Sequence, residues 1–152
     1  MGSMTDFYTR DAGNQGMKIP LVLPNGEESE DFLVIRSVDS DAFRMAESDA
    51  KREVMRAAQV DDIDERRRIA KENTLNMQVA LVKEWSFDEP CTPENVRVFL
   101  VGAPQVADAL DQLATKRALF IEKKSQNSKP TQSTKLNKRK PRKGQASAKA
   151  ST

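Results

Sequence analysis

The sequence predicts a mainly α-helical domain with an N-terminal β-hairpin and a disordered basic C-terminal tail. Two short Val/Ile/Leu-rich runs enclose a turn dipeptide, after which apolar residues recur every three or four positions. The charge then changes sharply at the end of the chain. A length of 152 residues suits one domain with a single core.

The charges divide the chain into two parts. Residues 1–124 contain 17 basic and 23 acidic residues, a net charge of −6, whereas residues 125–152 contain eight basic residues and no acid. Leu136 is the only large apolar residue of the second part, so burial cannot offset the entropy of ordering it. We therefore expect a disordered basic tail over 125–152. Most of its charge lies at Lys138, Arg139, Lys140, Arg142 and Lys143.

The other boundary lies near the start of the chain. Residues 1–16 carry little pattern and begin with Met-Gly-Ser-Met, which we interpret as a tag remnant before a flexible N-terminus. The folded domain is predicted over residues 17–124.

A β-hairpin is predicted at the start of this domain, with strands near 18–23 and 32–38. Asn25-Gly26 lies between them and tolerates the positive φ of a tight reversal. Pro20 and Pro24 cannot donate to a strand ladder, so the first strand is expected at the edge of the sheet.

Two helices are predicted after the hairpin. Asp39-Ser40 supplies an N-cap, and Gln59-Val60 is expected to break the helix before a second start at Asp61-Asp62. The apolar face of the first helix is Phe43, Ala46, Ala50, Val54 and Ala57. The face of the second helix is Ile63, Ile69, Ala70, Met77, Ala80, Leu81 and Trp85.

The sharpest local signal is Thr92-Pro93-Glu94-Asn95. Thr92 suits an N-cap and Pro93 the first helical position, where no N–H is needed, so both are predicted to cap a short helix. Gly102 is expected to end this helix in a left-handed conformation. Pro104 then opens a last helix that runs through Ile121.

The composition argues against an enzyme. The chain has no histidine and a single cysteine, which excludes Ser-His-Asp triads, Cys-His pairs and histidine-based metal sites. Cys91 precedes a helix N-terminus, a position that lowers a thiol pKa, but it has no catalytic partner. We expect no catalytic residues and no cofactor.

An acidic cluster allows two interpretations. It consists of Asp61, Asp62, Asp64 and Glu65, whose carboxylates could bind a divalent ion. The favoured interpretation is a helix start that faces Arg66, Arg67 and Arg68, because no calcium-loop pattern is present. No metal site is therefore expected.

The sequence contains neither a membrane-spanning run nor a signal peptide, and its lone cysteine cannot form an internal disulfide, so a cytoplasmic location without membrane contact is expected.

The basic tail has three interpretations that stay open. It could make weak contacts with a nucleic-acid backbone, dock on an acidic protein surface such as another copy, or remain solvated.

Residues 82–100, from Val82 to Leu100, resemble the tail assembly chaperones of long-tailed, lambda-like bacteriophages (siphoviruses). The resemblance covers about residues 17–124 and includes the segment from Val34 to Phe43. Its matching elements are Trp85, Asp88-Glu89, Thr92 to Val96, Phe99-Leu100 and Pro104.

This resemblance implies a non-enzymatic helper protein in the host cytoplasm that is absent from the mature virion. Such chaperones bind the tape measure protein and help the major tail protein polymerise into a tube around it. Many have a longer form made by ribosomal frameshifting. The family's task, together with the opposite charges of body and tail, leads us to expect self-association into a ring or spiral.

A nucleic-acid-binding regulator that uses the basic tail is the alternative function, although a body of charge −6 would repel phosphate. For the chaperone, a helix-in-groove contact with the client is expected. The predicted partner-binding residues are Trp85, Phe87, Val96, Phe99 and Leu100, each of which could equally be core.

Overall fold

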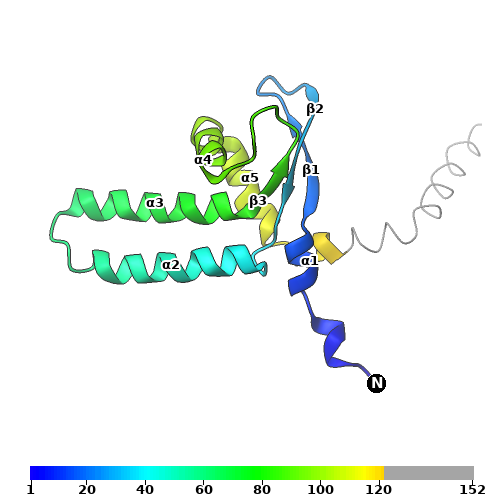
Figure 1. Cartoon of the computed structure of the whole chain (residues 1–152), viewed down its shortest axis with the longest axis horizontal. Helices are drawn as coiled ribbons and strands as arrows, with labels where there is room; N and C mark the ends of the chain where they lie inside the picture. The colour runs from blue at the N-terminus through cyan, green and yellow to red at the C-terminus, as the bar shows by residue number, and fades with distance from the viewer. Residues whose placement is uncertain (122–152) are drawn as a thin grey trace, which may run out of the picture.

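A computed structural model describes residues 1–121 (Figure 1). The elements are, in chain order, η1 (Met4–Phe7), α1 (Arg10–Gln15), β1 (Met17–Val22), β2 (Glu28–Ile35), α2 (Asp41–Ala57), α3 (Ile63–Leu81), β3 (Val82–Trp85), α4 (Pro93–Gly102) and α5 (Pro104–Ala114). Residues 117–121 are also helical. The predicted mainly helical fold is confirmed.

The strands form one antiparallel sheet in the order β1-β2-β3. The predicted hairpin is confirmed, with Pro20 opposite Phe32 and with Gly26 at a φ of 95° in the turn. Its second strand was expected near 32–38 but extends from Glu28 to Ile35. β1 lies at the edge, as its proline predicted, because no third strand requires the missing N–H there.

The third strand was not predicted. Trp85 was expected on the helix that contains Leu81, but the helix ends at Leu81 and Trp85 pairs with Leu33 of β2. Arg36 stabilises this change of direction. Its backbone N–H donates to the Leu81 carbonyl, and its guanidinium donates to the carbonyls of Ala80 and Val82, each at 3.0 Å.

α2 and α3 form a long antiparallel arm that projects from the rest of the molecule (Figure 1). The predicted caps and break are confirmed: Ser40 accepts from the Phe43 N–H, and Asp62 accepts from the Asp64 N–H. Val54 of α2 and Ile63 of α3 were expected on the apolar, buried faces of their helices, but both are exposed. Near its free end, the arm has only its own two helices to cover apolar side chains.

The hydrophobic core lies between one face of the sheet, the end of α3, and the helices α4 and α5 (Figure 1). Its most deeply buried large side chains are Leu33, Ile35, Leu81, Val96, Leu100 and Leu110. Gln78 of α3 donates to the Asp111 carboxylate of α5 at 2.7 Å, which ties the two helices together at the margin of the core.

The N-terminal segment differs from its prediction. Residues 1–16 were expected to be a flexible extension, whereas α1 packs on the body and buries Ala12 and Gly13. A Cβ on Gly13 would collide with the Ser37 hydroxyl, so only glycine permits this close approach. Asn14 and Asp41 add hydrogen bonds between α1 and the start of α2.

The C-terminal half of the domain brings two further corrections. Gly102 is the last residue of α4, and the positive-φ glycines of the described residues are Gly16 and Gly26, so Gly102 is not left-handed. The last helix was expected to run through Ile121, but α5 ends at Ala114 and helix resumes only at residue 117. The predicted disordered tail over 125–152 lies outside the described residues.

Candidate functional site

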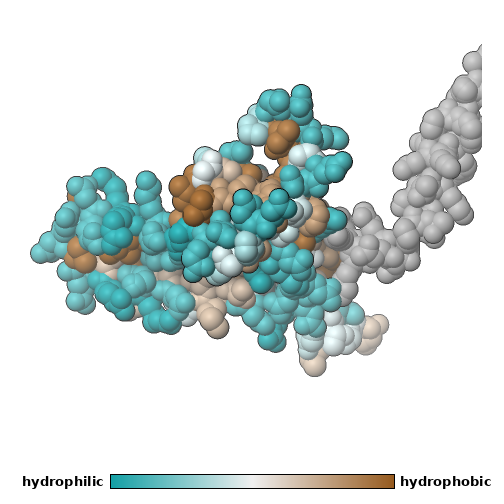
Figure 2. All heavy atoms as spheres, turned by 45° about the horizontal axis from the view of Figure 1, so that its top comes forward, coloured by the Kyte–Doolittle hydropathy of each residue, from teal (hydrophilic) through white to brown (hydrophobic). Residues whose placement is uncertain are grey.

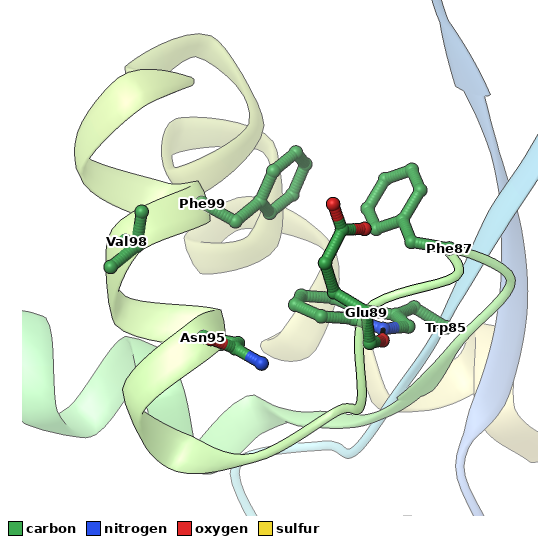
Figure 3. Close-up of a pocket in the computed structure, with 6 residues that line it drawn as sticks. All are labelled: Trp85, Phe87, Glu89, Asn95, Val98 and Phe99. Carbon is green, nitrogen blue, oxygen red and sulfur yellow. Dashed lines mark hydrogen bonds between the residues drawn. The ribbon is translucent and has the colours of Figure 1, made fainter.

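Three aromatic side chains meet at the surface where β3, the following turn and α4 converge (Figure 3). Trp85 ends β3, Phe87 lies in the turn and Phe99 projects from α4. The ring centroids are 5.0 Å apart for Trp85–Phe87, 5.8 Å for Trp85–Phe99 and 5.1 Å for Phe87–Phe99. The interplanar angles of 59° to 79° are in the tilted to edge-on range that aromatic rings favour.

Hydrogen bonds fix the turn that holds Phe87. At its start, the Ser86 hydroxyl donates to the Asp31 carboxylate at 2.8 Å and accepts from the Phe32 N–H at 2.9 Å. Across it, the Trp85 indole N–H donates to the Glu89 carbonyl at 2.7 Å. The aromatic positions are therefore set before any partner arrives.

The start of α4 is fixed by its predicted cap. The Thr92 hydroxyl accepts from the Asn95 N–H at 3.2 Å, and Pro93 occupies the first helical position. The Asn95 side chain also donates to the Pro90 carbonyl at 2.9 Å, which joins α4 to the turn. The predicted capping roles of Thr92 and Pro93 are confirmed.

The three rings border an open groove of about 370 Å³. Its lining residues are Trp85, Phe87, Glu89, Asn95, Val98 and Phe99. Val98 is 71% exposed and Val101, one turn further along α4, is 65% exposed, so the apolar surface continues beyond the groove. Figure 2 shows apolar patches on a mostly hydrophilic surface, one of them over the region of α4.

The surroundings of the groove are acidic. The Glu89 carboxylate projects between the rings of Phe87 and Phe99 (Figure 3). The segment 84–95 contains four acids and no base, the others being Glu84, Asp88 and Glu94, and of the four only Glu89 lines the groove. In the part of the chain that the structure describes, none of these four carboxylates forms an ion pair.

The nearest base of α4 is directed elsewhere. Arg97 forms an ion pair with Glu72 of α3 at 2.7 Å and also donates to the Asn76 side chain. Its charge is therefore already matched by Glu72, whereas the Glu89 carboxylate in the groove has no ion-pair partner among residues 1–121.

The structure divides the predicted partner-binding residues into two groups. Trp85, Phe87 and Phe99 line the groove together. Val96 and Leu100 are each 2% exposed in the hydrophobic core, so they cannot contact a partner. Their side chains lie on the face of α4 that packs on the body.

Sequence reasoning missed three lining residues, Glu89, Asn95 and Val98. Val98 follows Asn95 by three positions and precedes Val101 by three, so helical spacing places Asn95, Val98 and Val101 on one face of α4. That spacing was the signal available in the sequence.

The acidic cluster at the start of α3 is structural. Asp62 caps the helix, and Arg67 and Arg68 pair with Asp64 and Glu65 at 3.4 Å and 2.7 Å. Across residues 1–121, no group of three or more acidic or cysteine side chains is arranged to hold a metal ion.

Cys91 does not have the lowered pKa expected from its position before a helix. Burial raises the pKa of the Cys91 thiol, and the nearby Glu84 carboxylate acts in the same direction, while Arg36 opposes them. A raised pKa reduces the thiolate fraction, so this thiol is a poor nucleophile.

No helix within residues 1–121 is both long and apolar enough to cross a membrane. Comparison of the chain with protein-family models, with curated proteins and with solved structures finds no match.

Proposed function

We propose that this protein is a non-enzymatic tail assembly chaperone of a long-tailed bacteriophage. In this role it binds the tape measure protein in the host cytoplasm, promotes polymerisation of the major tail protein around it, and is absent from the mature virion. The observation that carries the proposal is the preformed groove of Trp85, Phe87 and Phe99, located in the segment that resembles this family.

The geometry suits a helical client. A tape measure is a long chain of amphipathic helices, and its apolar stripe must be covered before the tube encloses it. An apolar anchor on such a helix can enter the groove while the exposed side chains of Val98 and Val101 cover the next turn. Aromatic side chains in a fixed arrangement favour binding because little conformational entropy is lost.

Val98 offers a sharper test than the aromatic residues do. Phe87 contacts both other rings, so Phe87→Ser also removes aromatic pairs and lowers stability. Val98 lines the groove but is 71% exposed, so Val98→Ser should leave the fold intact. We expect Val98→Ser to weaken co-purification with the tape measure protein and to leave the melting temperature nearly unchanged.

Met45→Ser is the matched control, because it removes an exposed apolar side chain from α2, away from the groove. Both variants are co-expressed with the tape measure protein and compared with the wild type. Undiminished co-purification of Val98→Ser, or an equal loss for Met45→Ser, would count against the groove as the client site.

A further inference from the structure

The groove combines two recognition elements. Its floor and walls are aromatic, and its lining includes the carboxylate of Glu89, which is unpaired within the described residues and which Asp88 precedes in the same turn. This combination selects a peptide with one large apolar side chain among basic residues, because the apolar group fills the cavity while the bases lie near the rim.

The chain itself contains a segment of this chemistry. Leu136 is the only large apolar residue of 125–152, and it lies in the sequence Lys-Leu-Asn-Lys-Arg-Lys over residues 135–140. We propose that this segment binds in the groove of its own molecule, with Leu136 against the aromatic rings. Lys138, Arg139 and Lys140 then lie near the turn that contains Asp88 and Glu89.

The length of the connecting chain permits this contact. The described domain ends at Ile121, and Leu136 lies 15 residues further on. An extended chain of that length spans about 50 Å at roughly 3.3 Å per residue. A compact domain of this size has a radius of gyration of only about 14 Å. The connecting chain is therefore long enough to extend across a body of that radius to the groove.

The covalent connection also decides which copy supplies the segment. A short covalent link between two binding groups gives an effective concentration on the order of millimolar, which exceeds the concentration of a second copy in dilute solution. Each exposed charge pair contributes little by itself and is screened by salt. The contact is consequently weak enough for a client with a longer apolar stripe to displace it.

Trp85 provides a direct measurement because it is the only tryptophan of the chain and lines the groove. Its accessibility is measured by acrylamide quenching of the full-length protein at low salt, without any client. We expect Leu136→Ser to raise the quenching constant and shift the emission to longer wavelength. Leu136→Met should restore protection, and Ala146→Ser should behave as the wild type. High salt should bring the wild type to the level of Leu136→Ser.

Equal quenching of the wild type and Leu136→Ser would overturn the proposal. A difference that disappears on dilution would assign the segment to a second copy and overturn the intramolecular contact. The inference goes beyond the proposed function, and since the measurement contains no tape measure protein, its failure would leave client binding untouched. Conversely, if Val98→Ser co-purified with the tape measure protein as well as the wild type does, the proposed function would fail but the quenching result would stand.

Discussion

Trp85 occupies two environments at once. Its ring contacts Phe87 and Phe99 at the groove, while its indole N–H is satisfied by the Glu89 carbonyl. The hydrogen bond restricts the orientation of the indole, because rotating the ring would break it. The same residue therefore closes the turn and forms the floor of the groove.

Residue type alone could not separate the groove from the core. The sequence correctly brought Trp85, Phe87 and Phe99 together, but it assigned Val96 and Leu100 to the same surface. Grooves and cores use the same apolar residues, and the difference lies in which neighbouring element covers each side of α4. Which side of α4 is covered depends on the tertiary structure and cannot be read from the residue types.

Thr92 gives a prediction at the scale of a single residue. Its hydroxyl is the acceptor for the Asn95 N–H, so Thr92→Ala leaves a helix-end donor without that partner. The free energy of unfolding, measured by urea denaturation, should fall by about 1 kcal/mol. Thr92→Ser keeps the oxygen and should retain most of the stability. Equal stability of Thr92→Ala and the wild type would refute the capping role.

At the scale of elements, the sequence pattern predicted the hairpin and the longer helices but missed the short elements α1 and β3. The hairpin, the start of α2 and the break before α3 follow from turn dipeptides, caps and three-to-four spacing. β3 was missed because its four residues follow a helix directly and continue its apolar spacing as far as Trp85. Only pairing with β2 makes that segment a strand.

α1 was missed for a related reason. Its six residues include Gly13, a weak helix former, and none of its side chains shows an amphipathic pattern. The helix is stabilised instead by tertiary contacts, among them the close approach of Gly13 to Ser37 and the Asn14–Asp41 hydrogen bonds. Contacts between residues this far apart in sequence leave no local signal.

Asp39 joins two elements and gives a pH-dependent prediction. Its carboxylate pairs with Arg117, at the start of the last helical segment, at 2.6 Å and with Arg44 of α2 at 3.0 Å. The Arg117 hydrogen bond is the main cause that lowers the pKa of Asp39 from 3.8 to about 2, with Arg44 contributing less. A lowered carboxyl pKa stabilises the fold above the unfolded value, and this contribution is lost as pH falls toward about 2.

We therefore expect Asp39→Asn to lower the free energy of unfolding by about 1 kcal/mol at pH 7, a value reduced by the half-exposed arginines. The difference in free energy of unfolding between the variant and the wild type should shrink as pH falls from 3.8 to about 2, because the wild-type carboxyl becomes protonated. Urea denaturation at several pH values measures this change, and Arg117→Gln should lose much of the same contribution. A difference that does not depend on pH would show that the ion pairs are not its source.

At the scale of the whole molecule, the arm of α2 and α3 is the least covered part. Its ion pairs, such as Arg56–Glu53 and Arg68–Glu65, are between neighbouring turns and are exposed, so they contribute little stability. Val54, Met55 and Ile63 leave apolar surface exposed near the free end of the arm. β1 adds an open sheet edge, which its proline and Lys18 protect only partly.

These uncovered surfaces support the prediction of self-association into a ring or spiral. A contact between one arm and a different surface of the next copy would repeat from molecule to molecule, and such a contact closes a ring or extends a spiral. Sedimentation of the full-length protein at high concentration and low salt should show species larger than the monomer. Met55→Asp should shift this distribution toward the monomer, because it places a charge in the apolar end of the arm. Met45→Asp, on the same helix but far from that end, is the matched control. A wild type that stays monomeric under these conditions would contradict the prediction, and equal effects of both variants would remove the end of the arm from the interface.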